Sequence, residues 1–121
     1  MTITRLAALA AVAASVPFVS MAQNAEVHFW LKGNPGNITG CIAGDAQLTR
    51  EHTFILKDGQ ASVTSPGGIN TKLKLVRPNV YQEKITQGRL DLVVVADLSS
   101  TPKKLTATDA NMGCDWSAVK E

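Results

Sequence analysis

Short stretches of alternating apolar and polar residues run through the chain from residue 26 to residue 108. An alternation with a period of two puts one set of side chains toward a core and the other toward water, which is typical of half-buried β-strands. In the first stretch, Val27, Phe29 and Leu31 form the apolar set. The pattern predicts strands at residues 26–32, 48–56, 60–65, 71–76, 80–86, 90–98 and 104–108.

Turn-forming residues separate these segments. Asp58-Gly59 stands between two extended runs and is the strongest short-range signal for a β-hairpin. A second hairpin is expected at Gln87-Gly88, between the fifth and sixth predicted strands. No stretch after the N-terminal segment has a convincing helical period, although residues 110–121 could hold one short turn of helix.

Two predicted strands indicate which side chains should point inward. Leu73 and Leu75 are expected to face the core between outward-facing lysines. In the sixth strand the expected inward set is Leu90, Leu92, Val94, Ala96 and Leu98. Apolar residues also occupy the centre of its other face, which favours the middle of a sheet over an edge. The chain as a whole therefore predicts an all-β fold, a small antiparallel barrel or sandwich of about seven strands.

The first 22 residues follow a different pattern, which is typical of a secretory signal peptide. One basic residue, Arg5, precedes a run of apolar residues, and Ser20-Met21-Ala22 supplies the small residues that signal peptidase requires. The apolar run is shorter than the roughly 20 residues of a membrane span. We expect residues 1–22 to be cleaved between Ala22 and Gln23, leaving residues 23–121 as a single β domain with no membrane span.

The chain contains two cysteines, Cys41 and Cys114, far apart in the predicted mature domain. An even number of cysteines in an exported protein predicts a disulfide. If the strands follow one another as a meander, this bond ties the two ends of the sheet together and favours a closed or nearly closed barrel. A Greek-key order of strands would remove that consequence. A metal site and a redox pair find no support, because there is no C-x-x-C motif and there are only two histidines.

The charge of the chain limits its partners. The sequence has 12 basic and 10 acidic residues, and loss of Arg5 with the signal peptide would leave a net charge of about +1. The only adjacent basic pair is Lys103-Lys104. This distribution argues against nucleic acid and against an electrostatic membrane partner.

The residue types of common catalytic sites do not fall into a recognisable arrangement. His28 and His52 both lie within predicted strands and are interpreted as structural residues at a barrel surface or rim. Asp91 and Asp97 lie too far apart on one extended strand to act as a carboxylate pair. We therefore expect no enzymatic activity, no metal and no cofactor, and a hydrolase is the least favoured function.

Candidate binding residues lie in the first strand and in two loops rich in Gly and Asn. Trp30 falls among polar residues and is a possible exposed contact for a partner, whereas Trp116 is expected to pack over the disulfide or plug one end of the barrel. Asn34 and Asn37 lie in the loop after the first strand, and Asn70 lies in the loop before the fourth.

These observations predict an exported, non-catalytic binding domain, periplasmic or secreted, whose alanine-rich signal peptide and small size favour a Gram-negative bacterium. Its expected partner is another exported protein or a small apolar ligand, because small β-barrels commonly bind through loops or an interior cavity. The alternative is a structural or envelope-associated component that adds strands at a sheet edge. An apolar cavity would favour ligand binding, and a filled interior with an exposed Trp30 would favour a protein partner.

Overall fold

The computed structural model of the 121-residue chain describes residues 24–87 and 89–121. The predicted signal peptide, residues 1–22, and the predicted cleavage site between Ala22 and Gln23 lie outside the described residues. Among the described residues, no helix is long and apolar enough to cross a membrane.

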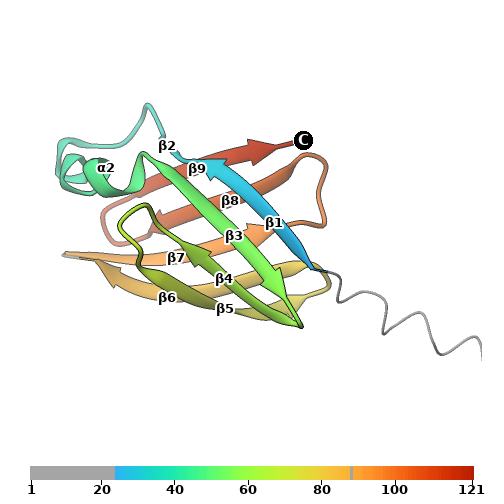
Figure 1. Ribbon diagram of the computed structural model, residues 1–121. Coiled ribbons are helices and arrows are strands. Elements are labelled where there is room, and N and C mark those ends of the chain that lie inside the picture. The colour runs from blue at the N-terminus through green and yellow to red at the C-terminus, as the bar shows by residue number, and fades with distance from the viewer. Residues whose placement is uncertain (1–23, 88) are drawn as a thin grey trace, which may run out of the picture.

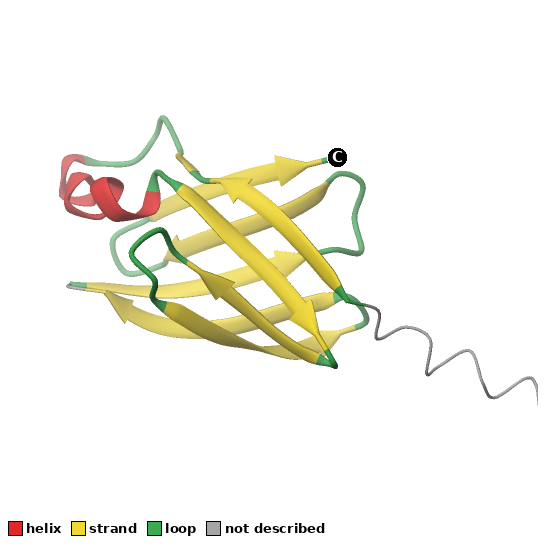
Figure 2. Cartoon of the chain, viewed as in Figure 1, coloured by secondary structure: helices red, strands yellow, loops and turns green. Residues whose placement is uncertain are grey.

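The described residues form one antiparallel sheet of nine strands that is nearly closed into a barrel (Figures 1 and 2). The elements in chain order are β1 (Ala25–Trp30), β2 (Lys32–Gly33), the 3-10 helix η2 (Thr39–Cys41), α2 (Ile42–Leu48), β3 (Glu51–Lys57), β4 (Gln60–Thr64), β5 (Asn70–Arg77), β6 (Val80–Gln87), β7 (Leu90–Asp97), β8 (Lys103–Asp109) and β9 (Cys114–Lys120). The strand order is β1-β3-β4-β5-β6-β7-β8-β9-β2, so the sheet is a meander rather than a Greek key.

A bend in the first strand brings the two ends of the sheet together. Trp30 of β1 is the register partner of Glu51 on β3, whereas Gly33 of β2 is the partner of Trp116 on β9. Leu31 lies between the two strands, with its side chain buried and its N–H bonded to a carbonyl beside β3. The predicted single strand at residues 26–32 is therefore two strands with different neighbours, and this is one reason why the count is nine rather than about seven.

The other missing strand is β9. Residues 110–121 were expected to hold at most a turn of helix, but Cys114–Lys120 pairs with β8 along its whole length. Cys114 and Trp116 are fully buried, whereas Asp115 and Ser117, which follow them in turn, are not. The stretch therefore does alternate. The expectation was wrong because Cys114 is the first inward residue of this strand. Counted with Trp116 it completes a two-residue alternation.

The expected absence of helix was also wrong. α2 occupies seven residues in the region between β2 and β3. Leu48 is its last residue and is buried, so β3 begins at Glu51 and not at residue 48 as predicted. A helix this short has little stability by itself. Its position is instead fixed by tertiary contacts, namely the disulfide at Cys41 and a hydrogen bond from Trp116 to Asp45.

The inward faces of the strands form the core. β7 lies between β6 and β8, and its alternating residues from Leu90 to Ala96 are buried, as predicted. Leu73 of β5 is buried as well. Leu75 is not: it is 63% exposed, because it lies at the point where the register between β5 and β6 shifts before Arg77.

Candidate functional site

A cavity of about 510 Å³ opens at one end of the barrel. At this end the chain passes through α2, the loop between β4 and β5 and the turn between β8 and β9, whereas the opposite end carries the β3–β4 and β5–β6 turns, the β7–β8 loop and the C-terminus (Figure 1). The walls of the cavity come from the inward faces of strands on several sides. They are mainly apolar and include Leu31, Leu48, Val63, Val94, Leu105 and Ala107.

Side-chain size explains why the space lies at this end. Val63 on β4, Val94 on β7 and Ala107 on β8 are inward residues of small or medium size that line it, together with the larger Leu105 on β8. Away from the cavity the core contains Phe54 and Tyr81, whose rings lie 5.4 Å apart between centroids. Val94 and Ala107 are register partners on adjacent strands, and Val63 lines the same cavity from β4, so small inward side chains on more than one side leave volume between them.

His52 is the buried polar side chain that lines the cavity. It is 5% exposed and belongs to the inward face of β3. Its Nε2 lies 3.1 Å from the carbonyl oxygen of Leu48. A carbonyl oxygen only accepts hydrogen bonds, so Nε2 carries the hydrogen and Nδ1 of the neutral ring is an acceptor. Nδ1 makes no hydrogen bond to any described residue.

Burial keeps this histidine uncharged. Loss of hydration lowers the pKa of His52 below its ordinary value of 6.5, and the hydrogen bond to Leu48 offsets only part of that effect. The sequence had indicated a structural histidine at a surface or rim. The structure places His52 inside the barrel instead, because residue 52 shares the inward face of β3 with Phe54.

Arg50 supplies the formal charge at the cavity. It lies just before β3, is exposed and lines the opening. Its carbonyl accepts the N–H of Leu31 at 3.0 Å, which fixes the backbone at this point. Within residues 24–87 and 89–121 its guanidinium has no ion pair, and none of the described residues lining the cavity is acidic.

The predicted disulfide is present between Cys41 and Cys114, with 5.8 Å between the Cα atoms. It joins η2 to the first residue of β9 and so fixes the segment that leads into α2. Trp116 is fully buried, and its Nε1 donates to Oδ1 of Asp45 at 2.7 Å. The disulfide and this hydrogen bond hold α2 against the barrel beside the cavity opening.

The four residues predicted as a binding surface do not form one site. Trp30 is 59% exposed on the outer side of β1 and shares a shallow groove with Asn34 and Val119 along the junction of β1, β2 and β9. Asn37 and Asn70 do not line this groove or the cavity. Trp30 and Asn34 are thus the pair that the fold brings together.

The three asparagines have local structural contacts. Oδ1 of Asn34 accepts the N–H of Gly36 at 2.8 Å and stabilises the turn after β2. The Asn37 side chain donates to the carbonyl of Asp115 and accepts its N–H, both at 2.9 Å, so it continues the pairing with β9. Asn70 donates to Oγ1 of Thr64 at 2.8 Å and closes the loop between β4 and β5.

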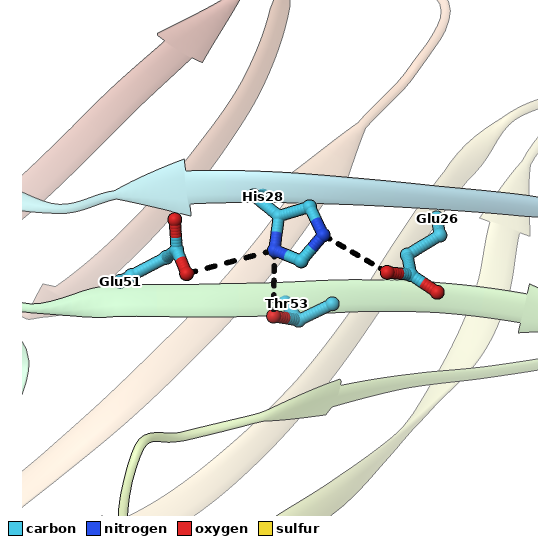
Figure 3. Close-up of polar contacts among 4 residues, drawn as sticks. All are labelled: Glu26, His28, Glu51 and Thr53. Carbon is cyan, nitrogen blue, oxygen red and sulfur yellow. Dashed lines mark hydrogen bonds and ion pairs between the residues drawn. The ribbon is translucent and has the colours of Figure 1, made fainter.

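A polar cluster surrounds His28 on the outer face of β1 and β3 (Figure 3). Nε2 of His28 lies 2.9 Å from Oε2 of Glu26, and Nδ1 lies 3.1 Å from Oγ1 of Thr53 and 3.6 Å from Oε1 of Glu51. A hydroxyl, an imidazole and a carboxylate follow one another here in the order of a nucleophile, a base and an acid.

Strand pairing accounts for this cluster. His28 and Thr53 are direct register partners, and Trp30 and Glu51 form the next outward pair, so their side chains meet on one face. The His28 and Glu51 side chains are about half exposed, and at such exposure ion pairs contribute little free energy. The cluster lies on the outside of the wall rather than in the cavity, which does not include His28. Among the described residues, no group of three or more His, Cys, Asp and Glu side chains is arranged to hold a metal ion.

Comparison with known proteins adds no further information. The chain matches no protein-family model, no curated protein and no solved structure. The function must therefore be argued from the cavity and its lining. Sequence reasoning missed Arg50 and the role of His52. His52 shares the two-residue period of Phe54 and Leu56, and this could have indicated a polar group inside the barrel.

Proposed function

We propose that this protein is an exported, non-catalytic binding protein that holds a small apolar ligand inside its barrel. The observation that carries the proposal is the cavity of about 510 Å³, which falls within the roughly 300–1,000 Å³ typical of small-molecule pockets. Its walls are mostly apolar with a few polar groups, as in such pockets generally. We place the protein in the periplasm or outside the cell, because disulfides persist in oxidising compartments.

The packing of the barrel supports this interpretation. Protein interiors are normally filled to about the density of organic crystals, and unfilled volume forfeits dispersion contacts. Larger residues at Val63, Val94 or Ala107 would fill the space, yet small or medium-sized ones occupy these inward positions on the cavity wall. A binding role gives a reason for keeping a volume that costs stability.

The experiment uses a neutral apolar fluorescent probe, N-phenyl-1-naphthylamine, and the Ala107→Phe variant. Ala107 lies on the cavity wall, so a phenyl ring at this position enters the space the ligand would occupy. We expect the protein to bind one equivalent of the probe and Ala107→Phe to weaken binding at least about tenfold. Urea unfolding should give a midpoint near that of the parent protein, because the ring fills existing space.

Thr108→Phe is the matched control. Thr108 is the next residue on β8 and is exposed on the outer face, so the same ring added there leaves the cavity unchanged. Thr108→Phe should bind the probe like the parent protein. Failure of the parent protein to bind, or equal binding by Ala107→Phe, would contradict the proposal.

A second candidate function is contact with an exported protein through the groove at Trp30. A specific observation favours it, since Trp30 and Val119 are both about 60% exposed and lie in the same groove, flanked by Lys32 and Lys120. An exposed tryptophan beside an apolar neighbour is typical of partner contacts. Recovery of one stoichiometric partner from the exported fraction, lost with Trp30→Ala and retained with Ala107→Phe, would support this function over ligand binding. The remaining alternative, strand addition as an envelope component, is less favoured because a nearly closed sheet leaves little free edge.

A further inference from the structure

We propose that the ligand is an amphiphile with an anionic head group, whose chain lies in the cavity and whose head pairs with Arg50 at the opening. This inference rests on the proposed function and specifies the class of ligand for the same cavity. It follows from three features of the lining: the sign of its charge, the position of that charge and the protonation of the one buried polar group.

The sign of the charge excludes a cationic head. Arg50 is the only Lys, Arg, Asp or Glu among the described residues that line the cavity. Its guanidinium has no acidic partner among the described residues, so its charge is not already neutralised by the protein. The planar guanidinium presents paired N–H donors that match a carboxylate or a phosphate and bind it with two parallel hydrogen bonds.

The position of Arg50 determines how the ligand would lie. Arg50 is exposed just before β3, while His52 follows two residues later on the buried inward face. Two residues of extended chain advance about 6.6 Å. The lining thus changes from a solvated cation at the opening to a neutral imidazole and then to aliphatic side chains such as Val94 and Leu105. This order matches a molecule with one charged end and one apolar end.

His52 restricts the head group to the opening. With its hydrogen on Nε2 and bonded to Leu48, the ring offers the cavity only the lone pair of Nδ1. That lone pair repels an anion. It can only accept a hydrogen bond from an O–H or N–H group, which an ionised carboxylate does not have. An anionic group deep in the cavity would therefore lose its hydration beside this lone pair and the aliphatic walls, which is strongly unfavourable.

The test uses protein purified after expression of the full-length chain. It measures how well ligands that share a dodecyl chain displace N-phenyl-1-naphthylamine from this protein. The ligands are dodecanoate, dodecyl phosphate, 1-dodecanol and dodecylammonium, each below its micelle concentration. We expect dodecanoate or dodecyl phosphate to bind at least about tenfold more tightly than 1-dodecanol and dodecylammonium, as expected for a charge-assisted pair. The ratio of the two anions then distinguishes a carboxylate ligand from a phosphate ligand.

Arg50→Gln should remove this preference, so that dodecanoate and dodecyl phosphate lose their advantage over 1-dodecanol. The matched control is Arg89→Gln, which removes the same charge from an exposed arginine in the turn before β7 that does not line the cavity. Arg89→Gln should keep the preference. Far-UV circular dichroism and the urea midpoint confirm that both variants are folded.

The outcomes separate this inference from the proposed function. If the probe and 1-dodecanol bind but the anions have no advantage, or if Arg50→Gln keeps the advantage, the head-group inference is wrong and ligand binding in the cavity stands. If neither the probe nor any dodecyl compound binds, the proposed function itself fails.

Discussion

Removal of the disulfide should destabilise the barrel by an amount that its loop length determines. Cys41 and Cys114 are separated by 73 residues. In the chain-entropy model, a loop of that length corresponds to about 4.4 kcal/mol of stabilisation at 25 °C, obtained by restricting the unfolded chain. Both cysteines are also buried, so replacement by alanine removes packed sulfur atoms as well. We therefore expect the double variant Cys41→Ala/Cys114→Ala to lose at least about 4.4 kcal/mol of unfolding free energy.

The variant should nevertheless fold. The reciprocal hydrogen bonds between Asn37 and Asp115 and the bond from Trp116 to Asp45 still hold the segment before β3 against β9. The contacts are independent of the cysteines, and the far-UV spectrum should remain that of a β protein.

The assay is urea unfolding at 25 °C, followed by tryptophan fluorescence and circular dichroism. With a slope of about 1–3 kcal/mol per molar urea for a small domain, the midpoint should fall by about 1.5–4 M. Coincident transitions by the two probes would justify a two-state treatment. A loss below about 1 kcal/mol would refute the reasoning, as would two free thiols in protein purified without reductant.

Two further substitutions test single residues of the structure. Asp109 is buried and accepts the N–H groups of Asp91, Asn111 and Met112 at 2.9–3.1 Å, so Asp109→Ala should cost at least about 3 kcal/mol in urea unfolding and Asp109→Asn clearly less. The pKa of His52 is lowered in the folded state, so below pH 6.5 the unfolded chain binds a proton that the folded chain does not. The free energy of unfolding should therefore be independent of His52 protonation above about pH 6.5. It should decrease as the pH is lowered from there toward the pKa of His52 in the folded state. His52→Leu should remove that slope between pH 7.5 and 5.5, and an unchanged slope would contradict the assignment.

Local sequence patterns were sufficient for most of the strands. The hairpin at Asp58-Gly59 and the inward face of β7 follow from turn chemistry and from the two-residue period, both of which act between near neighbours in the chain. The positions of β2, α2 and β9 did not follow from local pattern. Each is short or begins at a special residue, and each is stabilised by contacts with a distant part of the chain.

The candidate site was even less accessible to sequence reasoning. Trp30 could be recognised as a large apolar residue among polar ones, and it is exposed as expected for a contact residue. The cavity could not be recognised, because it arises where Val63, Val94 and Ala107 on three different strands face the same volume. The register of all the strands must be known before such residues can be placed together.

The sequence by itself determined the all-β class, the hairpin at Asp58-Gly59 and the two cysteines of the disulfide, since periodicity, turn residues and cysteine number are properties of the chain alone. The structure decided that the strands form a meander and not a Greek key. Only the tertiary structure decided that the first strand bends at Leu31 to close the barrel, that His52 lies inside it and that Arg50 stands at the cavity opening. The physical reason is that the volume inside a barrel, and the charge at its opening, depend on which side chains from distant segments share one space.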